Sequence, residues 1–177
     1  MKVQLHDILA VPSELAYAEP VAELNAMLHE GPHDYEFRAP LDVDLTFSRS
    51  LQDLFFDGSV HGIATATCAR CLAPFPLDVV KDFSLVLTPE QPLKGEIELA
   101  AGDLAESFYR GTEVDVTRLV YEQVLLALPT RPLCDEECRG LCPQCGVNRN
   151  TTACSCTVES GDPRFAVLRG LKIDGGS

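Results

Sequence analysis

Eight cysteines arranged in four close pairs constrain the fold of this 177-residue chain more than any other feature. A structural zinc site takes four ligands in a tetrahedron, so four pairs supply two complete sites. The sequence therefore predicts two structural zinc ions, with all eight cysteines as ligands. In chain order the pairs are Cys68/Cys71, Cys134/Cys138, Cys142/Cys145 and Cys154/Cys156.

The start of the chain and its hydropathy indicate that these thiols stay reduced. The first residues, MKVQLHDILAVPSEL, lack the basic region and the apolar stretch of a secretion signal. No segment approaches the roughly eighteen uninterrupted apolar residues that a membrane-spanning helix needs. We therefore expect a soluble cytoplasmic protein that binds no membrane, and in that compartment metal ligation is favoured over disulfides.

The third cysteine pair shows the local pattern of a metal site most clearly, in the sequence Cys142-Pro-Gln-Cys145-Gly146. The turn within such a pair directs backbone amides at both thiolates, and Gly146 tolerates the left-handed backbone that follows. A site closed by four protein ligands needs no histidine, and no histidine lies beyond His61.

Chain geometry ranks the ways in which the four pairs combine. The third and fourth pairs enclose only the loop 146–153, whose asparagines suit a tight turn, so we prefer them as one local site. The first pair, at the end of a predicted strand, would then meet the second pair, just past a predicted helix. The arrangement in which the first pair joins the third remains open.

The cysteines allow two other interpretations. Cys68 and Cys71 form a possible redox pair, since Arg70 favours a thiolate, but the strand-rich surroundings lack the βαβ context of thioredoxin-like sites. A catalytic zinc keeps an open position and usually recruits a base. The acidic residues 135–137 are more typical of a solvated turn, and no phosphate-binding loop or catalytic triad stands out. We expect no enzymatic activity and no small-molecule substrate.

Alternating apolar residues predict an α+β fold, an antiparallel β-meander packed by a helix. Strands are predicted over 41–48, 60–67 and 77–87, with a hairpin turn at Asp57-Gly58. A helix is predicted over 116–128, with Asp115 as its N-cap and Pro129 as its end. The core domain spans 1–130 and includes Cys68/Cys71, and the cysteine-rich zinc module with its C-terminal tail spans 131–177.

Three further segments have local patterns that predict their structure. A short helix is expected over 19–29, ended by Gly31-Pro32. The segment 88–113 is expected to be irregular, with a short strand around 96–100. The tail 163–173 has the spacing of a short amphipathic helix.

The formal charge of −13 bears on the partner, because affinity for nucleic acid comes largely from basic residues that neutralise phosphates. Residues 131–177 hold six basic and six acidic residues, so the acidic excess lies in the core domain. Direct contact with RNA, if it occurs, is therefore expected in the C-terminal module. Its candidate arginines are Arg131, Arg139, Arg149, Arg164 and Arg169.

Several segments, taken in order, resemble one family. They are CARCL at 68–72, DVTRLVYEQVLLALPTRPLC at 115–134, CRGLCPQCGVNRN at 138–150 with CSC at 154–156, and DPRFAVLRGL at 162–171. Over roughly residues 60–172 the chain resembles the YceD-like large ribosomal RNA subunit accumulation protein family. The family's cysteine motifs match Cys68, Cys71, Cys142 and Cys145 most plainly, whereas Arg149 stands where such segments more often have leucine.

The resemblance implies a role in the accumulation or processing of 23S rRNA during assembly of the large ribosomal subunit, without a known catalytic activity. The acidic charge favours binding to a basic ribosomal protein or an assembly factor, with an indirect effect on RNA. Two functional alternatives stay open: a zinc-structured interaction module unrelated to ribosomes, and a thiol redox protein that uses Cys68 and Cys71.

Overall fold

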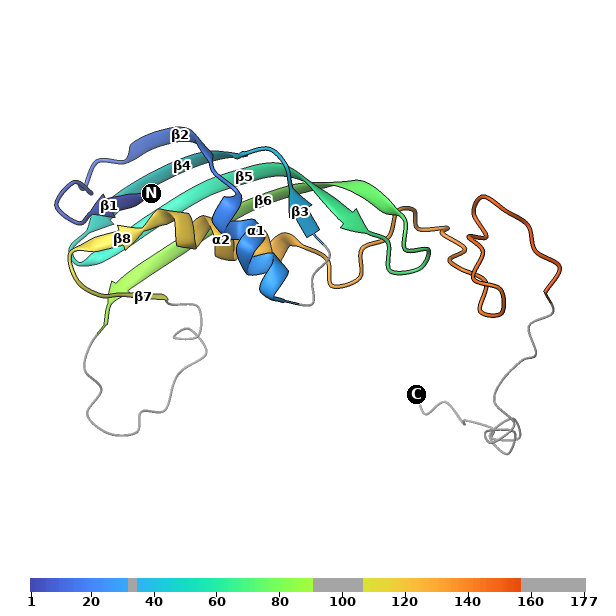
Figure 1. Cartoon of the computed structure of the whole chain (residues 1–177). Coiled ribbons are helices and arrows are strands. Elements are labelled where there is room, and N and C mark those ends of the chain that lie inside the picture. Colours follow the sequence, from blue (N-terminus) through green and yellow to red (C-terminus); the bar gives the residue numbers. More distant parts are fainter. Residues whose placement is uncertain (32–34, 91–106, 157–177) are drawn as a thin grey trace, which may run out of the picture.

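The computed structural model describes residues 1–31, 35–90 and 107–156 and shows an α+β fold with one large sheet (Figure 1). The sheet order is β2-β4-β5-β6-β7, and β3 pairs with β5 off this path. Strands β1 and β8 form a separate two-stranded sheet. The elements are β1 (Lys2–Gln4), β2 (Ser13–Glu19), α1 (Ala22–Glu30), β3 (Tyr35–Phe37), β4 (Leu41–Ser50), β5 (Asp53–Thr67), β6 (Pro74–Pro89), β7 (Ser107–Tyr109), β8 (Glu113–Asp115) and α2 (Val116–Ala127).

The centre of the sheet is the predicted antiparallel meander of β4, β5 and β6. Apolar residues alternate with polar ones along each strand, so one face of the sheet is apolar and packs into the core. In β4, for example, Leu41, Val43 and Leu45 are buried and the aspartates between them are exposed. The long β5–β6 pairing runs without interruption from Leu54↔Leu87 to Thr67↔Pro74.

The predicted hairpin turn at Asp57-Gly58 is wrong. Both residues lie inside β5 and pair with Thr46 and Leu45 of β4. The chain instead reverses at Leu51-Gln52, where Leu51 adopts a φ of 56°. Gly58 is required by crowding rather than by a turn, because a Cβ there would lie 2.6 Å from the Asp44 carbonyl oxygen.

Both helices cover the apolar face of the sheet (Figure 1). The predicted C-terminal helix is α2, in which Val116, Val120 and Val124 are buried in the core. The Asp115 side chain caps this helix by accepting a hydrogen bond from the Arg118 backbone N–H at 3.3 Å. Helix α1 begins later than predicted, at Ala22, because the preceding Glu19 belongs to β2.

The cysteine-rich segment 131–156 extends from the end of the sheet where β5 turns into β6 (Figure 1). This segment contains no helix or strand, only an isolated bridge between Leu141 and Asn148. Neither helix in the described ranges has the length and hydrophobicity to cross a membrane. The strand expected at 96–100 and the helix expected at 163–173 lie outside the described residues.

Candidate metal centres

Two groups of four cysteines are brought together in the structure. We call Cys68, Cys71, Cys134 and Cys138 the inner tetrad, and Cys142, Cys145, Cys154 and Cys156 the outer tetrad. Within each tetrad the four sulfur atoms all lie within 4.8 Å of one another. This grouping corresponds to the pairing preferred from chain geometry, and the first and third pairs lie in different tetrads.

The inner tetrad joins two segments that are far apart in the sequence. Cys68 and Cys71 lie on the turn between β5 and β6, and Cys134 and Cys138 lie beyond α2. Backbone hydrogen bonds tie the two segments together, from the Ala69 N–H to the Pro132 carbonyl oxygen at 2.8 Å, and from the Leu141 N–H to the Arg70 carbonyl oxygen at 3.0 Å. The turn of the sheet and the chain after the helix therefore hold the tetrad from both sides.

Two sulfur–sulfur distances in the inner tetrad match those of a tetrahedral metal site. The Sγ atoms of Cys68 and Cys138 are 3.8 Å apart, and those of Cys71 and Cys134 are 3.6 Å apart. Four sulfurs bound to zinc at about 2.3 Å would be separated by about 3.8 Å. A disulfide requires a separation of about 2.05 Å, and all eight cysteines are free. The donor set of four thiolates suits zinc or iron.

Burial and hydrogen bonds complete the surroundings of the inner tetrad. Cys68, Cys71 and Cys138 are buried, while Cys134 is exposed. The Arg70 backbone N–H donates to the Cys68 sulfur at 3.5 Å, and the Asn150 side-chain amide donates to the Cys138 sulfur at 3.2 Å. Such donors stabilise thiolates and orient them toward a metal.

The outer tetrad is local, as its short loop predicts. The Gly146 N–H donates to the Cys142 carbonyl oxygen at 2.9 Å, and Gly146 has a φ of +73°, the left-handed backbone expected after the third pair. Farther along, the Asn148 side chain accepts a hydrogen bond from the Asn150 N–H at 2.9 Å. The tight turn returns the chain toward Cys154 and Cys156.

The thiols of the two tetrads ionise unequally. Burial works against ionisation of Cys68, but backbone hydrogen bonds from Cys134, Cys71 and Arg70 outweigh it and lower the pKa of Cys68 to about 6. Loss of hydration and hydrogen bonds to neighbouring thiols raise the pKa of Cys134 to about 12. Four thiolates this close repel one another, and a bound divalent cation removes that repulsion.

The same contrast recurs in the outer tetrad. Backbone hydrogen bonds from Cys145 and Gln144 lower the pKa of Cys142 to about 6. A hydrogen bond with Cys145 and, to a smaller extent, loss of hydration raise the pKa of Cys156 to about 12. Each tetrad therefore contains a thiol whose pKa is lowered by backbone hydrogen bonds, and another whose pKa is raised by loss of hydration and by neighbouring thiols.

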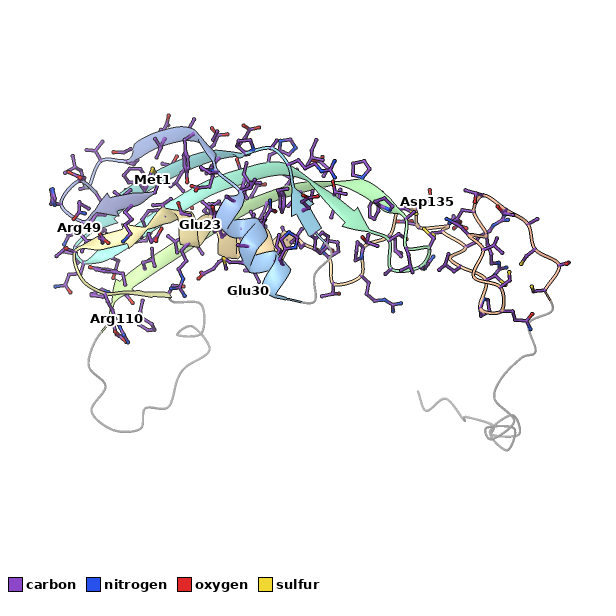
Figure 2. All side chains as sticks on the ribbon, in the orientation of Figure 1. Met1, Glu23, Glu30, Arg49, Arg110 and Asp135 are labelled. Atoms are coloured by element: carbon purple, nitrogen blue, oxygen red, sulfur yellow. The ribbon has the colours of Figure 1, made fainter. Side chains whose placement is uncertain are left out.

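The acidic residues 135–137 are exposed and form a turn. Figure 2 labels Asp135, which lies where the cysteine-rich segment meets the end of the sheet. The Asp135 carboxylate accepts a hydrogen bond from the Glu137 N–H at 2.7 Å, so it caps its own turn. A four-thiolate site is already closed and leaves no coordination position for a water molecule.

Comparison with known sequences identifies the family. The sequence model of the large ribosomal RNA subunit accumulation protein YceD matches residues 56–172, a region that contains both tetrads. This chain belongs to the YceD family. No solved structure matches it.

Relatives of this YceD-family chain occur in plants and bacteria. A maize protein named large ribosomal RNA subunit accumulation protein YCED homolog 1, chloroplastic, is 28% identical over 69% of the chain, and its Arabidopsis thaliana counterpart is 25% identical over 78%. An uncharacterized protein of Mycobacterium tuberculosis is 34% identical over 73% of the chain and 61% of its own length. The chain spans about half the length of the two plant proteins, 50% in each case.

Two residues that support the tetrads were not assigned this role from the sequence. The sequence predicts for Arg70 only that it favours a thiolate, yet its Nη1 donates to the carbonyl oxygens of Glu136 and Cys138 at 2.9 and 3.0 Å. Asn150 was assigned only to a turn, yet its side chain also accepts the Arg139 N–H at 2.7 Å. Both sets of contacts depend on segments that meet only in the folded chain, so local sequence patterns carry no signal for them.

Proposed function

We propose that this chain is a non-enzymatic factor in the biogenesis of the large ribosomal subunit, which supports the accumulation and processing of 23S rRNA. Membership of the YceD family carries this proposal, and the two plant relatives are named for accumulation of large-subunit ribosomal RNA. The structure adds two closed tetrads that suit a scaffold rather than a reaction centre.

We propose that both tetrads hold structural zinc. The closely spaced sulfurs, the free thiols and the N–H···S contacts of the inner tetrad all favour a four-thiolate ion. Iron has a similar preference for four thiolates, so elemental analysis of the protein purified without a histidine tag distinguishes the two metals.

The partner that we propose is a basic ribosomal protein or an assembly factor of the large subunit. A charge of −13 disfavours binding to naked RNA, and four-thiolate zinc sites would each add a charge of about −2. The second candidate is direct contact of the cysteine-rich segment with rRNA. One observation favours it, since Arg139 and Arg149 line the same hollow as Cys142, Cys154 and Cys156.

Depletion of the protein in its own organism tests the ribosomal role. The ratio of 23S to 16S rRNA and the amount of free large subunits should fall, and both should recover when the chain is expressed again. Unchanged ratios would contradict the role and would favour an interaction module unrelated to ribosomes. Reversible formation of a disulfide between Cys68 and Cys71 in protein purified without metal would instead favour thiol redox chemistry.

A further inference from the structure

The sheet has a second face, which points away from both helices and which we call the outer face (Figure 1). Strand alternation places exposed carboxylates from four adjacent strands on it. No lysine or arginine of β2, β4, β5 or β6 shares this face, because Arg49 and Lys81 occupy inward-facing strand positions. The exposed carboxylates are those of Glu14, Asp42, Asp44, Asp57, Asp78 and Asp82, of which Asp78 is already paired with His61 of the same face at 2.7 Å.

The strand register fixes how these carboxylates are spaced. Asp44, Ser59 and Asp82 form one row across β4, β5 and β6, and Asp57 lies one diagonal step from both aspartates. Diagonal neighbours in a sheet are about 7–8 Å apart, and residues two strands apart are separated by about 10 Å. These separations are too long for one cation, whose oxygen ligands lie within about 2.6 Å of the metal.

The outer face also has contact features other than charge. The side chains of Ile63 and Val80 are 58% and 60% exposed, on adjacent strands at diagonal positions. Elsewhere on the same face an open hollow of about 610 Å³ is lined by Glu14, Asp44, Asp57 and Asp82, among other residues. The face thus combines an apolar pair with a hollow surrounded by acidic groups, a combination that suits a polypeptide.

Charge complementarity identifies the occupant. RNA carries the same sign of charge and is repelled from this face. A polypeptide rich in lysine and arginine neutralises several carboxylates at once and covers the apolar pair with its aliphatic side-chain stems. We propose that the outer face docks a lysine- and arginine-rich segment of a protein partner. This inference rests on the proposed function for the kind of partner, and it adds the surface by which that partner is held.

Neutralising three carboxylates that line the hollow tests the proposal. The triple variant Asp44→Asn, Asp57→Asn and Asp82→Asn removes three charges from the outer face with little change in side-chain size. A matched variant, Glu23→Gln, Glu30→Gln and Glu122→Gln, removes three charges from exposed positions on the helices. Figure 2 shows Glu23 and Glu30 on the helix side of the sheet.

The probe is a synthetic peptide of about fifteen residues that alternates lysine and arginine with alanine, titrated by fluorescence anisotropy at about 0.15 M salt. We expect the outer-face variant to bind it at least about tenfold more weakly than the wild type, and the helix-side variant to change affinity less than about twofold. Equal weakening in both variants would show that only net charge matters and would overturn the proposal. Failure of the wild-type protein to bind would overturn it as well.

NMR mapping on the wild-type protein gives a second readout that needs no variant. The peptide should shift backbone amide signals of β4, β5 and β6 around Ser59, and shifts confined to other surfaces would refute the docking site. Tighter binding of a single-stranded RNA oligonucleotide than of the peptide to this face would also refute the docking site. None of these measurements involves ribosomes. If depletion lowers 23S rRNA but the peptide does not bind the outer face, the docking site is rejected and the proposed ribosomal role stands.

Discussion

Asn150 links the two tetrads through a single side chain. Its amide nitrogen donates to the Cys138 sulfur of the inner tetrad, and its amide oxygen accepts the Arg139 N–H. Asn150 itself lies on the loop that closes the outer tetrad, where its backbone N–H donates a hydrogen bond to Oδ1 of Asn148. One residue of the outer loop thus holds a cysteine of the inner tetrad by a hydrogen bond.

Replacement of Asn150 by alanine should weaken metal binding at the inner tetrad by about 10–100-fold, the usual cost of losing a group that orients a ligand. Competition with a chromophoric zinc chelator measures the affinity. Thr151→Ala is the matched control, because Thr151 lies in the same loop and its hydroxyl, within the described part of the chain, bonds only to Asn148 and Thr152. Equal affinities for Asn150→Ala and the wild type would contradict the orienting role.

Gly58 shows why a residue that usually marks a turn can lie in the middle of a strand. Gly58→Ala would place a Cβ 2.6 Å from the Asp44 carbonyl oxygen and 2.9 Å from Cζ of Phe83. We expect this change to lower the free energy of unfolding by about 1–3 kcal/mol, measured by urea denaturation. Ser59→Ala, at the next position of β5, should change it by less than about 0.5 kcal/mol. Equal stabilities of the two variants would argue against the crowding.

At the level of the elements, alternating apolar residues predict the meander, and apolar residues spaced three and four apart predict α2. These patterns could not locate the β4–β5 turn, since Leu51-Gln52 has no turn-forming residue and its backbone is set by the register of the two strands. The short strands β1, β3, β7 and β8 each have three residues, too few for a periodic pattern. The division of the chain at residue 130 into a core and a separate module stays a prediction.

The pairing of cysteines was predictable for a different reason. The third and fourth pairs close a short loop, which costs little chain entropy, so the first and second pairs remain to form the inner tetrad. The contacts of Arg70 and Asn150 were not predictable, because they join residues 66 to 68 positions apart or bridge two loops.

The two tetrads should contribute differently to the stability of the elements. The inner tetrad connects the β5–β6 turn to the chain beyond α2, whereas the outer tetrad lies entirely within 142–156. Cys71→Ser should therefore lower the Tm of the sheet by roughly 10 °C, and Cys154→Ser by less than about 3 °C. Thermal unfolding followed by circular dichroism compares them. Equal shifts would contradict the connecting role of the inner tetrad.

At the scale of the whole molecule, charge separates the two routes to rRNA. The acidic outer face and the total charge of −13 favour a protein partner over RNA. Fragments of 23S rRNA titrated at about 0.15 M salt should therefore bind with a Kd above about 10 μM. Submicromolar binding that is lost on replacing Arg139 and Arg149 with alanine would contradict this expectation and favour direct contact by the cysteine-rich segment.

The metal content of the purified protein decides whether the eight cysteines hold two structural metal ions, as we propose. Metal content per chain is measured by mass spectrometry on protein purified without a histidine tag under reducing conditions, together with a count of reactive thiols before and after chelation. We predict about two zinc ions per chain, thiols that react only after chelation, and unfolding of the cysteine-rich segment once the metal is removed. Protein without metal, whose thiols are free or reversibly oxidised, would contradict the two structural metal sites.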